Sequence, residues 1–305
     1  MRSKNGKKVL RFTPPMSAPV GRLVSDTATQ PDMFVPCGKC VLCRSALRRE
    51  WIKRMRLELF SNPDATFITL TYDDEHCPEG VNKPDVQNFI KRLRNLKRDY
   101  GITLPKFKYF ICSEYGSRTY RPHYHGIIFG VDCVRAQFMR AYVATTKVDN
   151  GRRYPVISSR VLERVWRNGF VSIDAVTPSS IRYVSKYIVK GDNDFDMDGY
   201  FPNFYLYSRR IGTGLFLRKD GMTDFAYSSF GRGRMLIDRD GYEESAPRFL
   251  RRYFDMYDAD FAEEIASKRR DFALHKPPSD FDSAKARAEF IINERAKYKQ
   301  KEILT

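Results

Sequence analysis

The sequence predicts an α+β fold in which helices pack on one face of an antiparallel sheet. Between residues 65 and 191 the predicted elements follow the order β-α-β-β-α-α-β-α, which favours such a sheet. Apolar residues make up 42% of the 305 residues and aromatic residues 14%, which excludes a disordered chain. A chain of this length can bury one substantial core and a second small lobe.

The individual elements follow from the spacing of apolar residues. Runs rich in Thr, Ile, Tyr and Phe predict strands, and apolar residues three or four positions apart predict helices. Strands are expected at residues 65–75, 106–116, 123–130 and 168–176. Helices are expected from residue 41 onward and at residues 83–101, 132–144, 158–167, 179–191, 245–273 and 281–299. Pro84 and Gly101 suit the two ends of the second helix, and the pair Ser179 and Ser180 is expected to cap the helix that ends at 191.

Changes in composition along the chain predict four segments. The first is rich in Pro, Thr and Ser and is expected to be extended, and the last is rich in Tyr and Arg and is expected to be largely helical. The segments are an N-terminal lead-in at 1–36, a cysteine cluster with a basic helix at 37–60, the α+β core at 61–191 and the C-terminal region at 192–305.

The charge of the chain predicts a polyanionic partner. Lysine and arginine exceed aspartate and glutamate by a formal charge of +17, with a pI near 9.6. Nucleic acid is the leading partner, an anionic membrane the weaker alternative, and a merely solvated basic surface the simplest alternative. No apolar run is long enough to span a membrane, and the basic N-terminus lacks the apolar stretch of a secretory signal, so we expect a cytosolic protein.

Two basic helices are candidates for contact with phosphate groups. Such contacts would make binding sensitive to salt but would not select a DNA sequence. A helix face that is only solvated explains the same charges. The candidates are Arg44, Arg48, Arg49, Lys53, Arg54 and Arg56 on the first helix, and Lys91, Arg92, Arg94, Lys97 and Arg98 on the second.

Two of the four histidines stand in the stretch RPHYHGIIFG at 121–130. In a strand, side chains at positions i and i+2 share a face, so His123 and His125 project together. Glu114 lies on the preceding strand, and an antiparallel return would place its carboxylate opposite the pair. Two imidazoles and a carboxylate suit Mn²⁺ or Mg²⁺, although Zn²⁺ or Co²⁺ would bind more tightly. Two histidines satisfied by hydrogen bonds at the edge of the core are the alternative.

The stretch YVSKYIVK at 183–190 contains tyrosine followed three residues later by lysine, twice. On a helix, Tyr183, Tyr187 and Lys190 lie along one stripe. A phenol has a pKa near 10, so a nucleophilic tyrosine needs a nearby cation or base, which Lys186 and Lys190 would supply. Tyrosines that only pack the helix against the sheet are the alternative.

Three cysteines at spacings of three, Cys37, Cys40 and Cys43, predict a structural zinc site. A closed site needs one more ligand. Cys77, Cys112, Cys133 or His76 would supply it. Reduced cysteines that only pack are the next alternative, and an iron–sulfur cluster is the last.

Together, these motifs resemble the HUH endonucleases, the rolling-circle replication initiators, and most of all those of the microviruses of the gokushovirus branch. FITLTY, HYH with Tyr124 between its histidines, and the YVSKY helix stand in the order and spacing of that family. CGKCVLC, SEYGSRTYRPHYHGIIFG and YVSKYIVK match the microvirus pattern over about residues 35–191. Each motif alone is weak, but the ordered set is specific.

The resemblance implies an HUH endonuclease core with a ferredoxin-like sheet, in which His123, His125 and Glu114 hold a divalent metal ion. It implies that Tyr183 and Tyr187 are the nucleophiles. One of them would attack DNA at a replication origin, forming a 5′-phosphotyrosine and a free 3′-OH, and the strand would later be rejoined. Thr69, Thr71 and Tyr72 would belong to the first motif, with a structural or DNA-contacting role.

The same resemblance implies single-stranded or supercoiled DNA as substrate and action in the cytoplasm of a bacterial host. The sequence has no GxxxxGK[ST] phosphate loop, so a helicase as well as the polymerase is expected to come from the host. Three alternatives remain. They are a relaxase or tyrosine transposase with the same chemistry, a non-cleaving nucleic-acid-binding protein, and a metal nuclease in which water attacks.

Overall fold

The computed structural model describes residues 10–11, 34–35, 38, 41–116, 119–149, 151–188, 201–218, 221–232, 235–236, 243–244 and 247–275. By its internal contacts the chain divides into two units, one of Glu50–Ile265 and one of Met1–Arg49 with Ala266–Thr305. The four segments expected from composition stay a prediction. In the second unit, β1 (Leu10–Arg11) and β2 (Phe34–Val35) form a short parallel pair.

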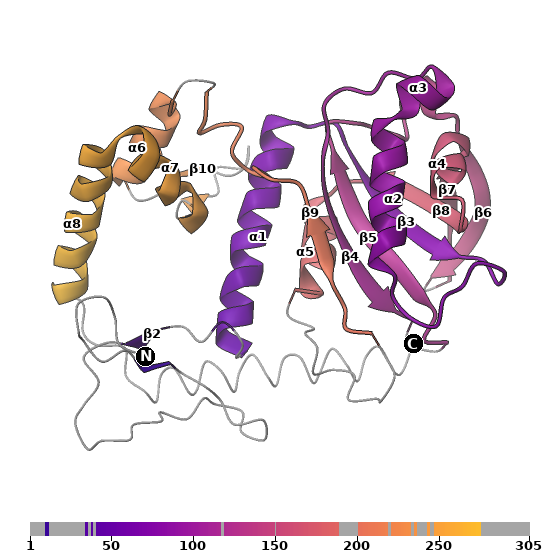
Figure 1. Cartoon of the computed structure of the whole chain (residues 1–305), viewed down its shortest axis with the longest axis horizontal. Helices are drawn as coiled ribbons and strands as arrows, with labels where there is room; N and C mark the ends of the chain where they lie inside the picture. The colour runs from indigo at the N-terminus through magenta and orange to yellow at the C-terminus, as the bar shows by residue number, and fades with distance from the viewer. Residues whose placement is uncertain are drawn as a thin grey trace. The chain divides into compact units, whose positions relative to one another are not determined.

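A seven-stranded antiparallel sheet with helices packed on it confirms the predicted α+β class (Figure 1). Its order is β6-β7-β8-β3-β5-β4-β9, and each of its strand pairs is antiparallel. The strands are β3 (Ala65–Tyr72), β4 (Lys108–Tyr115), β5 (Pro122–Phe129), β6 (Ala141–Asp149), β7 (Arg152–Ser159), β8 (Gly169–Ala175) and β9 (Tyr205–Tyr207).

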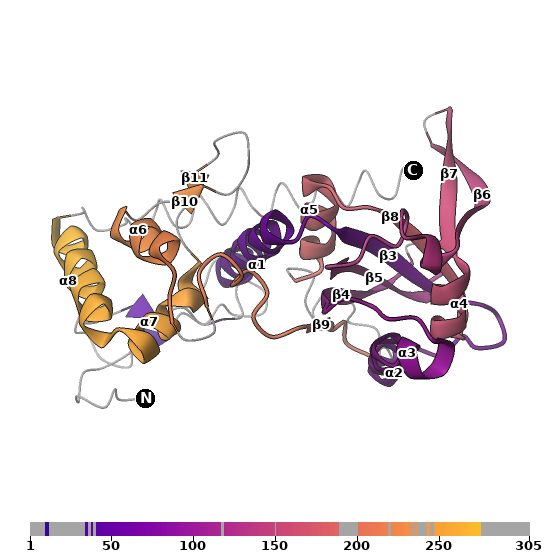
Figure 2. The same cartoon turned by 90° about the horizontal axis from the view of Figure 1, so that it is seen from above.

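Helices cover both faces of the sheet, so the expectation of one covered face was wrong. On one face α2 (Lys83–Arg94) and α4 (Arg160–Trp166) pack against Tyr124 and Ile128 of β5. On the other, α5 (Pro178–Lys186) and the part of α1 (Val41–Ser61) from Trp51 onward pack against Ile127 and Phe129. Figure 2 shows α2 and α5 on opposite sides. Both sets of alternating β5 residues are apolar, which is the signature of a strand buried on two faces.

Local sequence explains where the helices begin and end. Pro84 lies in the first turn of α2, and the expected helix at 83–101 breaks at Asn95 into α2 and a short α3 (Leu96–Tyr100). Gly101 ends α3 with φ 70°, a left-handed conformation that glycine adopts without strain. The cap of α5 is Thr177 rather than the serine pair, and Ser180 completes a capping box with it.

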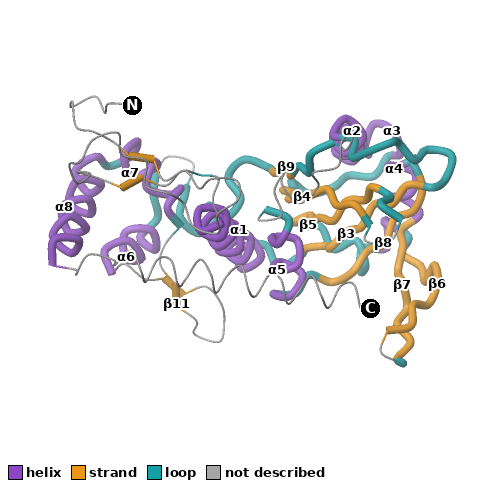
Figure 3. Tube along the Cα trace, turned by 90° about the horizontal axis from the view of Figure 1, so that it is seen from below, coloured by secondary structure: helices purple, strands orange, loops and turns teal. Residues whose placement is uncertain are grey.

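The helix expected at 132–144 was wrong. After a turn, the chain forms a 3-10 helix, η1 (Gln137–Met139), and then enters β6, which pairs with β7 in a two-stranded ribbon that projects from the sheet (Figure 3). The register shifts between Val143 and Thr145, and this bulge interrupts the alternation by which a strand is recognised. The helix expected at 158–167 is α4, capped by Ser159.

The C-terminal part of the larger unit forms its own apolar cluster. Phe216, Phe230 and Phe254 pack there with Leu57 of α1. The helix expected at 245–273 is divided at Asp258, whose carboxylate accepts a hydrogen bond from the Phe261 amide. The elements are α6 (Asp224–Arg232), β10 (Met235–Leu236), β11 (Glu243–Glu244), η3 (Arg248–Leu250), α7 (Arg251–Tyr257) and α8 (Ala259–His275). The helix expected at 281–299 lies outside the described residues.

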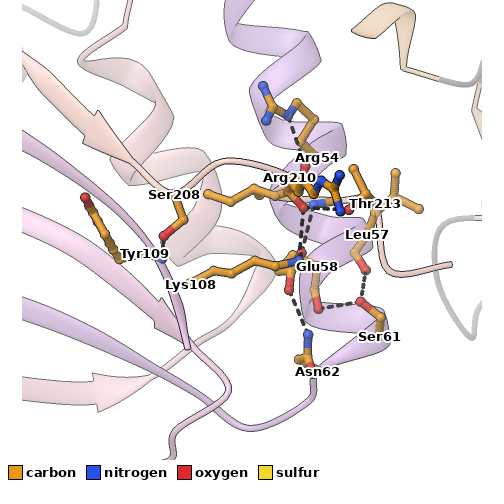
Figure 4. Close-up of polar contacts among 12 residues, drawn as sticks. Arg54, Leu57, Glu58, Ser61, Asn62, Lys108, Tyr109, Ser208, Arg210 and Thr213 are labelled. Carbon is orange, nitrogen blue, oxygen red and sulfur yellow. Dashed lines mark hydrogen bonds and ion pairs between the residues drawn. The ribbon is translucent and has the colours of Figure 1, made fainter. Parts of the chain in front are cut away.

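A buried carboxylate ties α1 to the sheet (Figure 4). Glu58 is fully buried and forms an ion pair of 2.7 Å with Lys108 of β4. The same carboxylate oxygen accepts the amide of Gly212 at 2.8 Å, and Lys108 also donates to the Arg210 carbonyl at 3.0 Å. Three separate segments are therefore fixed around one charge. Within the described residues, no helix combines the length and apolar character needed to span a membrane.

Candidate active site

Strand pairing brings three metal-ligating side chains to one spot. In the β4–β5 register, Glu114 lies directly opposite His123, as the hairpin prediction required, and His125 follows on the same face. The Nε2 atoms of His123 and His125 lie 3.3 and 3.2 Å from the same carboxylate oxygen, Oε2 of Glu114. Their candidate ligand atoms are all within 4.8 Å of one another.

Hydrogen bonds on the far side of each ring orient the imidazoles. Nδ1 of His123 lies 3.2 Å from the Arg121 carbonyl oxygen. Since a carbonyl only accepts, Nδ1 carries the proton and Nε2 presents its lone pair to Glu114. Nδ1 of His125 lies 3.0 Å from Thr69 Oγ1 on β3. Outer partners of this kind fix the ring orientation of metal-binding histidines.

The protonation states also suit a metal site. Burial raises the pKa of Glu114, but hydrogen bonds from His123, His125 and Tyr187 outweigh burial and hold this pKa below its usual range. Burial lowers the pKa of His125, against the opposing effect of Glu114. A charged carboxylate beside a neutral imidazole is the state in which both groups bind a metal.

The triad of Glu114, His123 and His125 is therefore compatible with a divalent metal ion. It is the one group of three metal-ligating side chains found among the described residues. Its two nitrogen ligands and one oxygen ligand suit ions that accept imidazole and carboxylate together. The role of each residue as a ligand stays a prediction.

Both tyrosines of the YVSKY helix reach the triad. Tyr183 is 36% exposed, and its hydroxyl lies 3.2 Å from His125 Nε2 and 3.5 Å from Glu114 Oε2. Tyr187 is buried, and its hydroxyl donates a hydrogen bond to that same Glu114 oxygen. The two rings meet edge to face with centroids 5.6 Å apart. Two phenols and two imidazoles thus converge on one carboxylate oxygen.

One lysine lies beside both phenol rings. The Nζ atom of Lys186 is 4.1 Å from the ring centroid of Tyr183 and 5.3 Å from that of Tyr187. Burial raises the pKa of Tyr187, and the negative charge of Glu114 raises it further, so this phenol is neutral at pH 7. The expectation that each lysine assists one tyrosine is only half accessible, because Lys190 lies outside the described residues.

The first motif, FITLTY, has two faces with different roles. Thr69 bonds His125, and Phe67 stacks on the same imidazole with centroids 5.9 Å apart. Tyr72 points to the opposite face, where it is fully buried and donates to Asp85 at 2.8 Å. Sequence reasoning missed Phe67. The signal for it was alternation, since Phe67 and Thr69 share a face on a strand that pairs with the histidine strand.

Several basic residues that were candidates for phosphate contact are engaged inside the fold. Arg92 donates to the carbonyls of Val165 and Trp166, at 2.6 and 2.9 Å, at the end of α4. Arg54 donates to the Ile211 carbonyl at 3.1 Å, and burial lowers its pKa to about 10. Lys53 is 7% exposed. These three side chains are therefore oriented by the protein itself.

Other candidates are exposed. Lys91 and Arg94 are exposed on α2, which covers the face of the sheet opposite the triad. Arg49 is exposed, and it belongs with Arg44 and Arg48 to the smaller unit. Contact of these residues with DNA stays a prediction.

The proposed zinc site also stays a prediction. Cys37 and Cys40 lie outside the described residues. Cys112 is fully buried and donates to the His125 carbonyl at 3.3 Å, and burial raises the pKa of this thiol. Burial likewise raises the pKa of Cys133 to about 11. His76 is paired with Asp73 at 2.7 Å. Protonated thiols are not zinc ligands, so neither buried cysteine favours a zinc site.

The fold and this site define a class of phage replication proteins. The family model of the ORF2-type replication-associated protein matches residues 65–192, from β3 to beyond α5. Relatives are the replication-associated proteins ORF2 of Spiroplasma virus 4 (32% identical over 192 residues), VP4 of Bdellovibrio phage phiMH2K (31% over 231) and ORF4 of Chlamydia phage 1 (30% over 158).

The chain belongs to this family of replication-associated proteins, and the predicted resemblance is confirmed. The three matches cover 60%, 73% and 51% of this chain. They cover 57%, 67% and 38% of the relatives in the same order, so the chain matches between about two fifths and two thirds of their lengths. No solved structure matches the chain.

Proposed function

We propose that this protein initiates rolling-circle replication by nicking single-stranded DNA through tyrosine transesterification. The observation that carries the proposal is the convergence of Tyr183 and Tyr187 on Glu114 Oε2, the atom that also faces both imidazoles. A phosphodiester held at this point meets two nucleophiles and a place for a metal ion. Packing alone would not require both hydroxyl groups to end at one charged oxygen.

The reaction exchanges one phosphoester for another. The phenol oxygen attacks phosphorus, the bond from phosphorus to the 3′ oxygen breaks, and that oxygen takes up a proton. The products are a 5′-phosphotyrosine and a free 3′-OH that a polymerase can extend. A divalent ion, Mg²⁺ or Mn²⁺, held by His123, His125 and Glu114 would withdraw charge from a non-bridging oxygen of the phosphate.

The chain's own residues prepare the nucleophiles. The ammonium group of Lys186, 4.1 Å from the Tyr183 ring, favours the phenolate that develops during attack. Edge contact with Phe67, at a centroid distance of 6.1 Å, positions the same ring. Because the phosphotyrosine keeps the energy of the broken phosphodiester, rejoining the strand needs no nucleotide cofactor.

The two tyrosines differ in access, which assigns their order. Tyr183 is 36% exposed and Tyr187 is 5% exposed. An incoming strand therefore meets Tyr183 first. After one round of copying, Tyr187 would cut the regenerated origin, and the released 3′-OH would resolve the older linkage into a circle.

The setting follows from the same proposal. The substrate is single-stranded or supercoiled DNA at a replication origin, in the cytoplasm of a bacterial host. Strand separation and synthesis are assigned to the host helicase and DNA polymerase, because the sequence has no phosphate loop of its own.

The test is formation of a covalent adduct. Purified protein is mixed with single-stranded circular DNA carrying its origin and with Mn²⁺, and the products are separated under denaturing conditions. The expected result is a protein–DNA band that is lost with EDTA, in His123→Ala, and in the Tyr183→Phe/Tyr187→Phe double variant. Cleavage without attached protein would instead support a hydrolytic metal nuclease. Binding without cleavage would support a non-cleaving nucleic-acid-binding protein.

A further inference from the structure

Phe170 presents an aromatic ring to solvent on the face of the sheet that carries the triad. It lies on β8 and is 65% exposed, whereas its neighbours Val171 and Ile173 are buried against the α2 side. It belongs to none of the hydrophobic clusters formed by the described residues. Single exposed apolar residues are common, so its position must carry the argument.

That position is in line with the site. Strand pairing sets Glu114 opposite His123, His123 opposite Thr71, and Thr71 opposite Phe170. The four residues therefore form one row across β4, β5, β3 and β8, on one face of the sheet. With strands about 4.8 Å apart, the backbone of Phe170 is about 10 Å from that of His123. A strand of DNA whose phosphate lies at the triad passes within reach of the ring.

The backbone that carries Phe170 is fixed. Gly169 has φ 136°, and a Cβ atom at this position would lie 2.3 Å from the Asp73 amide nitrogen. That amide donates to the Asn168 carbonyl at 3.0 Å, and the Trp166 indole donates to the Thr71 carbonyl at 3.1 Å. The ring is therefore presented by a rigid strand and not by a loose loop.

We propose that Phe170 stacks on a base of the single-stranded DNA, next to the nucleotide whose phosphate is cut. The inference rests on the proposed function, since it is the DNA strand at the triad that brings a base to this ring. A net charge of +17 and the Lys186 ammonium group beside the triad favour a polyanion on this face. An exposed ring next to a phosphate site is the arrangement by which proteins hold single strands without reading their sequence.

The test measures binding to oligothymidylate of about 16 nucleotides, in EDTA so that no strand is cut. Phe170→Ala is expected to weaken binding roughly 5- to 150-fold, the range found for loss of one base–aromatic stack. Phe170→Trp should bind like the wild type and Phe170→Leu should not, because leucine is apolar but has no π face. The control is Phe138→Ala, which removes a ring that is 42% exposed on η1, beside Tyr100 and Arg164.

An oligomer of the same length without bases isolates the stacking interaction. Truncation of Phe170 should cost affinity with oligothymidylate and none with the abasic strand, while the salt dependence stays unchanged because no phosphate contact is lost. Equal binding by wild type and Phe170→Ala, an equal loss in Phe170→Ala on both strands, or no binding by the wild type would overturn the inference. A wild type that binds but forms no adduct on origin DNA would contradict the proposed function alone.

Discussion

The Tyr187 hydroxyl donates its hydrogen bond to the Glu114 oxygen that faces both histidine rings. This contact places the buried tyrosine in the same polar network as the candidate metal ligands. It also separates the two phenols chemically, because burial and the negative charge of Glu114 both raise the pKa of Tyr187. The exposed phenol of Tyr183 is the one that meets substrate first.

The first prediction concerns this order. We expect Tyr183→Phe to slow formation of the first adduct by about 100-fold or more, the scale on which enzymes lose rate when a nucleophile is removed. Tyr187→Phe should leave the first cut within a few-fold of wild type and abolish release of a closed circle. Single-turnover kinetics on origin DNA measure both. The reverse pattern would reassign the two roles.

The second prediction concerns the outer partner of His125. Thr69→Val keeps the shape of the side chain but removes the hydroxyl that lies 3.0 Å from Nδ1. Loss of such a partner weakens metal binding by about 10- to 100-fold, so calorimetric titration with Mn²⁺ should show a decrease of that size. Ser172→Ala is the matched control, since Ser172 pairs with Thr69 in the sheet. Unchanged affinity in Thr69→Val would remove this residue from the account.

The third prediction concerns the lysine between the phenols. Lys186→Gln should slow adduct formation by about tenfold, as expected for the loss of one cation beside an aromatic ring. Lys186→Arg should restore most of the rate. Mn²⁺ affinity serves as the second readout and should not fall in either variant, because Lys186 does not contribute a ligand. A parallel loss of metal affinity and rate would indicate a structural role.

The fourth prediction concerns the buried pair that anchors α1. Lys108→Met leaves the Glu58 charge buried without its partner, and Lys108 itself is 29% exposed. We therefore expect the free energy of unfolding to fall by about 2 kcal/mol, less than for a fully enclosed pair. Denaturant titration measures it. Arg98→Met removes an exposed ion pair with Asp99 and should leave the midpoint unchanged.

The fifth prediction concerns pH and the metal-free protein. Burial lowers the pKa of His125, so the unfolded chain takes up this proton at a higher pH than the folded chain. The corresponding stability is fully present above the unfolded pKa, about 6.5, and is lost as the pH falls towards the folded pKa. His125→Gln should therefore flatten the pH dependence of unfolding below about pH 6.5.

A histidine of opposite sign provides the control for this experiment. The hydrogen bond to Asp73 raises the pKa of His76, so its contribution is present at low pH and is lost as the pH rises. His76→Gln should change the profile in the other direction. Identical profiles for wild type and His125→Gln would contradict the assigned protonation state.

Much of the site was predictable from short-range pattern. Alternation along β5 placed His123 and His125 on one face, and the hairpin that precedes them set Glu114 opposite. Helical spacing placed Tyr183 and Tyr187 on one stripe of α5 and its C-cap. In each case the residues concerned lie within one element or in two strands joined by a short loop.

The rest depended on contacts distant in sequence. Arg92 is a basic surface residue by its helix position, and only the carbonyls of Val165 and Trp166, more than 70 positions away, make it structural. The β6–β7 ribbon was missed because a bulge breaks its alternation. The exposure of Phe170 depends on what covers β8, which no local pattern encodes.

The most direct test of the central claim is to locate the covalent bond. The adduct formed on origin DNA is digested with protease and nuclease, and the remaining peptide is analysed by mass spectrometry. The account predicts a nucleotide linked through its 5′ phosphate to Tyr183, and to Tyr187 when Tyr183 is replaced by phenylalanine. A nucleotide on any other residue, or cleaved DNA with a 5′ phosphate and no peptide attached, would contradict it.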